Sequence, residues 1–171
     1  MIKKVILIIL LIILIGGGYI AWIVLGSNTS FSEKRKFLYV KTGSGFADLM
    51  KDMRSGGFIK NPGIFSFVAR KAGLPEKIKA GKYEIKNGAS ILSVVRMLRN
   101  GKQTPVNLVI TKLRTKEDFA RFAGRQLECD SLDTINYLNN NDSLKHIGLD
   151  SNTVMTAIIP NTYTFYLNTT A

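Results

Sequence analysis

The sequence predicts an α+β protein with a single N-terminal transmembrane helix. The first observation is a 21-residue run without a charged side chain, Val5–Leu25, directly preceded by Lys3 and Lys4. As a helix, this run is about 30 Å long, enough to cross the hydrocarbon core of a bilayer. The second observation is that short strand-like and helix-like segments fill the remaining residues. We therefore expect a membrane anchor over residues 1–26, followed by mixed α+β structure.

A cleaved secretory signal is the alternative for this run, because Gly16-Gly17-Gly18 could end its apolar core. The apolar residues continue beyond these glycines, however. Tyr19 and Trp22 stand near the far boundary, where aromatic side chains often anchor a span at the interface. Val24-Leu25-Gly26 is only a poor cleavage site. We favour the uncleaved anchor, and both interpretations deliver residues 27 onward to the same side.

The charges beside the run predict its orientation. Lys3 and Lys4 stand directly before it, whereas residues 26–33 behind it carry only Glu33. A second basic cluster, within residues 34–41, lies farther from the span. Since basic residues close to a span remain in the cytoplasm, we expect a single-pass protein of the inner (plasma) membrane. Its N terminus is then cytoplasmic and its globular part periplasmic or extracytoplasmic.

After a linker at residues 27–36, a first module is expected over residues 37–102. Its expected elements are a strand at 37–40, a helix from 46 to Gly56-Gly57, a helix from Asn61-Pro62 to Gly73, a strand at 82–85 and a helix from Ser90 to Gly101. Apolar residues recur at helical spacing in all three helices. Asn61 and Ser90 are residue types that cap helix N termini, and glycine commonly ends a helix.

The second unit is expected over residues 103–171. A strand at 106–111 opens it. Thr115 stands three residues before Asp118, which is the spacing of a capping box, and so predicts a helix through Leu127. A short helix from Asp130 or Ser131 through Leu138, a polar loop and a final segment at 153–171 complete the unit.

The charge of the chain is unevenly distributed. Residues 34–116 hold 19 Lys and Arg against four acids, a net charge of +15, whereas residues 117–171 have a net charge of −4. A basic half suggests a polyanionic partner, such as anionic lipid or a cell-wall polymer with carboxylates, and a solvated lysine-rich surface is the equal alternative. Nucleic acid is disfavoured, because the aromatic residues follow apolar periodicity instead of alternating with basic residues.

Several kinds of site are excluded by composition. Cys129 and His146 are the only residues of their types, so neither an intramolecular disulfide nor a usual zinc site can form, and a Cys or Ser triad lacks partners. His146 is expected in an exposed loop. Gly43-Ser44-Gly45 stands where a dinucleotide fingerprint would, but Asp48 takes the third small position and would repel a pyrophosphate. We expect no metal and no cofactor.

Two motifs resemble one known family. The run Ala80–Ile85 (AGKYEI), followed by Gly88-Ala89-Ser90, Leu98 and Gly101, is similar to a pattern of the YceG-like endolytic murein transglycosylases. The later run Ile159–Tyr163 (IPNTY) resembles the PDTY segment of the same family in an Asn-containing form. The order of anchor, basic module and PNTY segment also agrees, so the resemblance covers essentially the whole of residues 1–171.

The resemblance implies a single-pass enzyme that cuts nascent peptidoglycan glycan strands internally and leaves 1,6-anhydro-muramyl ends. It also implies that residues 37–102 are a small LysM-like α+β module and that residues 103–171 begin an α+β catalytic domain. The family's members are roughly twice as long as this chain. We therefore expect residues 103–171 to be the amino-terminal part of a truncated transglycosylase domain. Peptidoglycan synthases are further expected partners.

The implied substrate-binding residues are Asn161, Thr162 and Tyr163, with the tyrosine stacking on a sugar ring. A plain Pro-Asn turn with a half-buried tyrosine is an equal alternative. The catalytic acid is not identified. The family places a Glu-Gly pair where this chain has Met155 and Thr156, and related Asn-type sequences place Glu where it has Thr164.

Two other functions stay open beside the enzyme. The first is a non-catalytic peptidoglycan-binding or cell-wall scaffold module, in which the LysM-like part acts. The second is an anchored interaction protein of the division or elongation machinery. Lys79, Lys82 and Lys86 are candidates for a basic edge that meets stem-peptide carboxylates, although solvated lysines explain them more simply.

Overall fold

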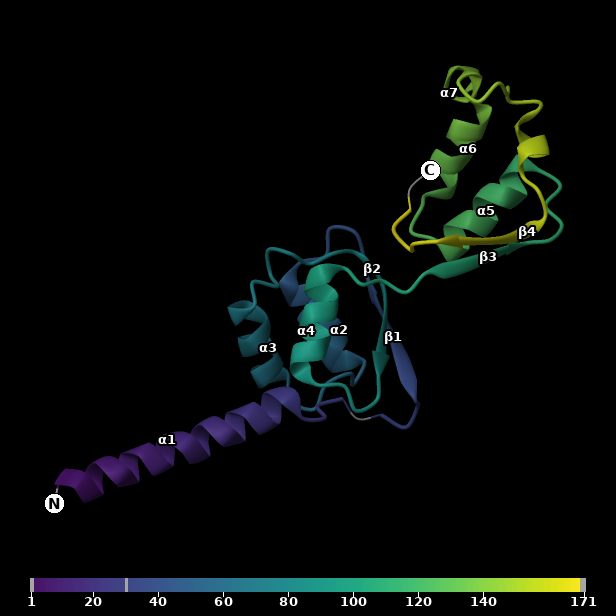
Figure 1. Cartoon of the computed structure of the whole chain (residues 1–171). Coiled ribbons are helices and arrows are strands. Elements are labelled where there is room, and N and C mark those ends of the chain that lie inside the picture. The colour runs from purple at the N-terminus through teal and green to yellow at the C-terminus, as the bar shows by residue number, and fades with distance from the viewer. Residues whose placement is uncertain (1, 30, 170–171) are drawn as a thin grey trace. The chain divides into compact units, whose positions relative to one another are not determined.

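The computed structural model describes residues 2–29 and 31–169, so parts of the expected segments lie outside the described residues: Met1, Ser30, Thr170 and Ala171. The fold is mixed α+β (Figure 1). The chain divides into two compact units. The first comprises residues up to 38 together with 44–79 and 83–102, and the second comprises 39–43, 80–82 and the residues from 103 onward.

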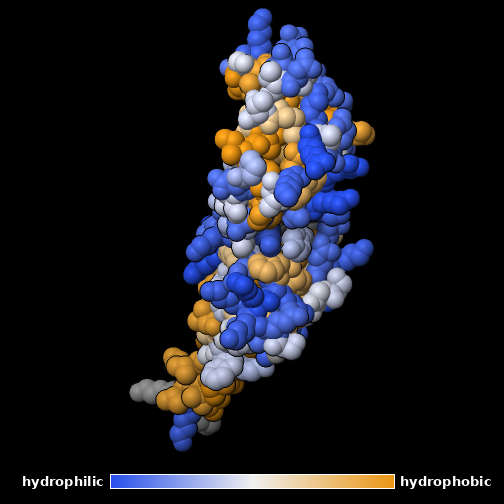
Figure 2. All heavy atoms as spheres, turned by 90° about the vertical axis from the view of Figure 1, so that its right-hand side faces the viewer, coloured by the Kyte–Doolittle hydropathy of each residue, from blue (hydrophilic) through white to orange (hydrophobic). Residues whose placement is uncertain are grey.

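Helix α1, Ile2–Leu25, contains the apolar run (Figure 1). Its Lys4–Leu25 portion has a mean hydropathy of 2.8, and none of its most apolar window is buried. Figure 2 shows this helix as a hydrophobic surface, whereas hydrophilic residues cover much of the rest of that face. Trp22 is 79% exposed. Length and composition therefore confirm a helix that suits a membrane anchor or a signal sequence.

Beyond α1, the first unit contains α2 (Phe46–Ser55), α3 (Pro62–Lys71), α4 (Ile91–Asn100) and most of β1 (Arg35–Val40) and β2 (Gly81–Lys86). Strands β1 and β2 form a two-stranded sheet. The helices begin and end largely as the sequence predicts. Ser90 caps α4 by accepting a hydrogen bond from the Ser93 N–H at 3.2 Å. Gly101 ends α4 with φ +67°, a left-handed conformation that favours glycine.

The predicted side-chain cap of α3 is wrong. Asn61 stands at the N-cap position and Pro62 begins the helix, but the Asn61 side chain makes no capping hydrogen bond. Its backbone N–H instead donates to the Asn28 side-chain oxygen at 3.3 Å. The residue is therefore positioned by a segment 33 residues away in the chain, which local sequence rules do not include.

Phe65 and Tyr83 are the largest fully buried side chains of the first unit. They pack within a core that also contains Leu49, Met53, Leu74, Ile85, Ile91 and Leu98. The Tyr83 hydroxyl donates to the Lys79 carbonyl at 2.7 Å, so its polar end has a partner. Burial of Tyr83 raises its pKa above the ordinary value of 10.0. Tyr83 belongs to the AGKYEI run, which is therefore an essential part of the core.

The residues that follow α1 are held to the first unit by hydrogen bonds. Asn28 and Thr29 are only 3% and 1% exposed, although both are polar. The Asn28 N–H donates to the Ala89 carbonyl at 3.0 Å, and the Lys60 N–H donates to the Asn28 carbonyl at 2.8 Å. The segment that the sequence analysis treats as a linker thus contributes buried hydrogen-bonded residues to the first unit.

The second unit contains β3 (Val106–Ile110), α5 (Lys116–Gln126), α6 (Ser131–Asn139), α7 (Asn141–Lys145), the 3₁₀ turn η1 (Val154–Ala157) and β4 (Asn161–Phe165). Thr115 caps α5 as expected, accepting from the Asp118 N–H at 3.1 Å. Strands β3 and β4 pair antiparallel. A small core of Leu138, Leu144 and Val154 joins α6, α7 and η1.

Two phenylalanines on α3 test the core. We expect Phe65→Ala to lower the free energy of unfolding by about 3–5 kcal/mol, because it empties a fully buried position. The control, Phe67→Ala, removes a ring that is 63% exposed and should change it by less than about 1 kcal/mol. Urea denaturation of the whole chain in detergent measures both. Similar losses from the two variants would contradict the burial of Phe65.

Candidate functional site

The PNTY segment forms most of strand β4, which is held in register by β3. Leu108 lies opposite Tyr163, and Val109 lies opposite Thr162. Because Leu108 and Ile110 are buried, the side of the strand pair that carries them faces the interior. Side chains alternate along a strand, and directly paired residues of two strands share a face. The strand pair therefore has an inner apolar face and an outer, solvent-facing side.

The outer face carries the polar groups. Asn107 and Thr164 are paired across the strands, and the Thr164 hydroxyl donates to the Asn107 side-chain oxygen at 3.3 Å. Thr162 lies on the same face, two residues along β4. All three are exposed to solvent. Hydroxyl and amide groups of this kind both donate and accept hydrogen bonds, as sugar hydroxyls and acetamide groups require.

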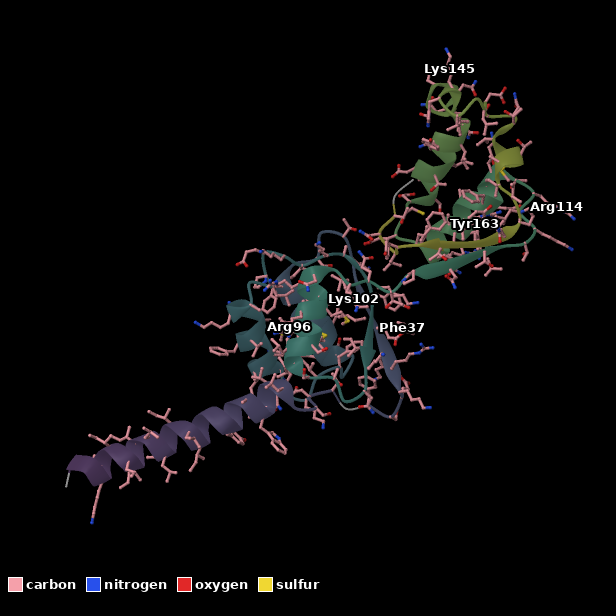
Figure 3. The ribbon with its side chains drawn as sticks, in the orientation of Figure 1. Phe37, Arg96, Lys102, Arg114, Lys145 and Tyr163 are labelled. Carbon is pink, nitrogen blue, oxygen red and sulfur yellow. The ribbon has the colours of Figure 1, made fainter. Side chains whose placement is uncertain are left out.

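Tyr163 lies on the inner face instead (Figure 3). Its ring lines a cavity of about 280 Å³, together with Leu108 from β3 and Phe119 from α5. Its hydroxyl donates to the Ile159 carbonyl at 2.9 Å, which closes the turn that leads into β4. The ring of Phe165 lies 6.4 Å from that of Tyr163. The Tyr163 side chain is thus partly buried.

Asn161 begins β4 opposite Ile110 and is exposed. Its side-chain oxygen accepts a hydrogen bond from the Thr162 N–H at 2.7 Å. Asn161 and Tyr163 thus share one face of β4, while Thr162 points to the other. The structure does not gather the three expected binding residues on one surface.

Neither residue at the family's acid positions can donate a proton at neutral pH. Met155 lies in η1 and packs against the small core of the second unit. Thr156, its neighbour, donates its hydroxyl to the Thr153 carbonyl at 2.7 Å. Thr164 stands on the outer face beside Asn107. The sequence contains no Asp or Glu after Asp150, so β4 itself carries no carboxyl group.

The carboxylates of the second unit have other partners. Hydrogen bonds from Arg121 and Thr115 lower the pKa of Asp118, and hydrogen bonds from Thr153 and Asn152 lower that of Asp150. Both groups are therefore ionised at neutral pH and cannot act as general acids. Both oxygens of Glu128 accept hydrogen bonds from Thr42, at 2.8 and 2.9 Å.

Among the described residues, no group of three or more His, Cys, Asp or Glu side chains could hold a metal ion. His146 is exposed directly after α7, as expected, and Cys129 is a free, partly buried thiol.

Sequence reasoning missed Asn107 as a site residue. The signal was present, because Val106, Leu108 and Ile110 alternate with Asn107 and Val109 and so assign the latter two to the opposite face. What the sequence lacked was the pairing of β3 with β4, which brings Asn107 beside Thr164 from 57 residues away.

Tyr163→Phe tests the role of the tyrosine hydroxyl. We expect this variant to lower the free energy of unfolding by about 1 kcal/mol, because the Ile159 carbonyl loses its donor. The control is Tyr166→Phe, at a side chain that is 56% exposed, and should leave stability nearly unchanged. Chemical denaturation compares the two. Unchanged stability in Tyr163→Phe would argue that the hydroxyl does not hold the turn.

Arg121→Ala should raise the pKa of Asp118 toward its ordinary value of 3.8, since the Arg121 hydrogen bond is the largest cause of the lowering. The lowered pKa favours the carboxylate, so its contribution to stability is present above the ordinary value and is lost as the pH falls through the lowered one. NMR titration of the Asp118 carboxyl carbon measures the shift. Arg125→Ala, on the same helix, is the control, and an equal change in both variants would contradict the assignment.

Comparisons with known proteins identify the family of the chain. The YceG-like family matches residues 38–171 of the chain. Among solved structures, a yceG-like protein from Listeria monocytogenes is similar, with 22% sequence identity, a TM-score of 0.46, and coverage of 78% of this chain and 48% of that one. The chain thus spans about half the length of that protein. None of the curated proteins compared with the chain matches it. Since the family match extends over most of the sequence and includes both the AGKYEI and PNTY runs, the chain belongs to the YceG-like family, whose members are MltG-type enzymes.

Proposed function

We propose that the protein is a membrane-anchored endolytic lytic transglycosylase that cleaves nascent peptidoglycan glycan strands and leaves 1,6-anhydro-muramyl ends. The observation that carries the proposal is the family match over residues 38–171, because the members of this family are MltG-type enzymes. Helix α1 supports it by supplying a span of sufficient length and hydropathy, although a signal sequence would share these properties. The active body would then lie on the extracytoplasmic side, where the glycan is.

The proposed reaction is an intramolecular displacement. A carboxylic acid of the enzyme protonates the glycosidic oxygen, and the bond between that oxygen and the muramyl anomeric carbon breaks. The same group, now a carboxylate, accepts the proton of the muramyl 6-hydroxyl as its oxygen bonds to the anomeric carbon. The acid is thereby restored. Because the substrate supplies the nucleophile, one carboxyl group suffices, unlike the two that ordinary glycoside hydrolases use.

The outer face of β3–β4 is the proposed glycan-positioning surface, defined by Asn107, Thr162 and Thr164. Its three exposed side chains offer hydrogen bonds to sugar hydroxyls and acetamides at a spacing set by the strand register. Asn161, exposed at the start of β4, lies on the opposite face with Tyr163 and is not part of this surface. Tyr163 positions the strand from beneath through its bond to the Ile159 carbonyl. We assign the acid to no residue of this chain.

Residues 37–102 are proposed to bind the same polymer as a LysM-like module. The support is the element order β1-α2-α3-β2, in which two strands enclose two helices and form one sheet. The module has an excess of basic side chains, which suits stem-peptide carboxylates. Peptidoglycan synthases remain proposed partners.

A non-catalytic peptidoglycan-binding module is the second candidate function. It is favoured by one specific observation: the family's acid positions hold Met155 and Thr164, and neither side chain can donate a proton at neutral pH. In that case the polar outer face and the βααβ module would bind glycan without cleaving it. Both candidates share the substrate and differ in its fate.

Incubation of the purified chain with peptidoglycan, followed by analysis of the muropeptides, separates the two. Anhydro-muramyl ends above those of a protein-free control support the enzyme. Retention of the chain on sacculi with no new ends supports the binding module. If the chain is not retained on sacculi and produces no new anhydro-muramyl ends, both proposals are overturned.

The outer face is tested by the double variant Asn107→Ala/Thr162→Val. Loss of two neutral hydrogen bonds, each contributing about 0.5–1.5 kcal/mol, should weaken binding or cleavage about tenfold. Asn136→Ala, an exposed asparagine of α6, is the matched control. Sacculus pull-down and anhydro-end yield are the measurements. A double variant that behaves like Asn136→Ala would exclude this face from glycan contact.

A further inference from the structure

The segment behind α1 is attached to two loops of the first unit by closely placed hydrogen bonds. The Thr29 hydroxyl donates to the Lys86 carbonyl and accepts from the Ala89 N–H, both at 2.8 Å. The Lys60 N–H donates to the Asn28 carbonyl at 2.8 Å. Two loops, around residues 60 and 86–89, are thereby fixed beside Asn28 and Thr29.

These loops must lie close to the end of α1. Asn28 follows Leu25 by three residues, and an extended chain advances at most about 3.6 Å per residue. Asn28 is therefore within about 11 Å of the last residue of the apolar helix, whatever direction the connection takes. The polar head-group layer of a bilayer is about 5–8 Å thick on each side. If α1 spans the membrane, the two loops are at the level of the head groups or directly above it.

Three lysines surround this attachment point. Lys60 and Lys86 have the backbone hydrogen bonds just described, and the Lys34 carbonyl accepts from the Asn87 N–H at 3.0 Å. All three side chains are exposed. Glu33, next to Lys34, is the acid nearest in sequence. We name Lys34, Lys60 and Lys86 the juxtamembrane collar.

We propose that the juxtamembrane collar binds the head groups of anionic phospholipids. The inference rests on the membrane anchor of the proposed function and adds a partner to it. Lipid fits better than a wall polymer, because the covalent connection keeps the collar within about one Debye length, roughly 8–10 Å, of the membrane surface. Basic residues at this distance are attracted to anionic lipid. The contact would orient the first unit on the bilayer.

Lysine reactivity in vesicles tests the proposal. The whole chain is reconstituted into vesicles of phosphatidylcholine alone or with one quarter phosphatidylglycerol, and its amines are labelled with an acylating reagent. Mass spectrometry then gives the labelling rate of each lysine. We expect the three collar lysines to react at least threefold more slowly in the anionic vesicles, and 1 M salt to remove the difference.

Lys102, labelled in Figure 3, is the internal control. It follows Gly101 at the C-terminal end of α4, whereas Ser90, which follows Ala89, caps the other end of this helix. Ten helical residues place it about 15 Å from the collar end, so its rate should not depend on lipid charge. In the variant Lys34→Gln/Lys60→Gln/Lys86→Gln, Lys102 should again label equally in both kinds of vesicle.

Failure of the inference and failure of the anchor are distinguishable. A chain that is washed off both kinds of vesicle by alkaline carbonate lacks the anchor, which overturns the inference with it. A chain that remains embedded but whose collar lysines react equally fast in both lipids overturns the inference alone. Slowing of Lys102 to the same degree would show an unspecific surface effect and would also overturn it.

Discussion

The buried hydrogen bonds of Asn28 and Thr29 are the constraint on which the first unit depends. Both side chains are removed from water immediately after a helix that is apolar throughout. A buried polar group without a partner destabilises a fold by about 1–3 kcal/mol. Here the Asn28 side-chain oxygen accepts from the Asn61 N–H, and the Thr29 hydroxyl donates to the Lys86 carbonyl and accepts from the Ala89 N–H. The result is a junction in which the residues next to the apolar helix help to close the domain that follows.

The second unit is organised differently. Its strand pair has an outer face that carries Asn107, Thr162 and Thr164 and an inner face that carries Leu108 and Tyr163, and the inner face borders a cavity of about 280 Å³ beside α5. Tyr163 has two structural roles: its ring lines the cavity, and its hydroxyl holds the turn before β4 by donating to the Ile159 carbonyl. The outward direction of Thr162 and Thr164 therefore follows from the inward direction of Tyr163, through the alternation of a strand.

Features determined by local sequence could be predicted. Ser90 and Thr115 cap their helices because their hydroxyl groups reach N–H groups three residues ahead, and Gly101 ends α4 because it tolerates a positive φ. The apolar periodicities placed α2 to α6 within one or two residues, whereas α7, in the expected polar loop, was missed.

Features that depend on distant pairing could not be predicted. Leu108 lies opposite Tyr163 only because β3 and β4 pair. The division of the PNTY residues between two faces therefore could not be predicted from the local sequence. Asn28 and Thr29 resemble linker residues until their partners, 32 and 57 or more positions away, are known. The same long-range contact explains why Asn61 does not cap α3.

The short connection of Gly26 and Ser27 also limits how far the first unit can lie from the end of α1. From the end of α1, about 11 Å of extended chain and then about 15 Å of helix α4 lead to Gly101, so the far end of that helix stands within about 30 Å of the end of α1. If α1 is a membrane anchor, the first unit is confined to the layer next to the lipid. In the proposed function, newly made glycan enters that layer first.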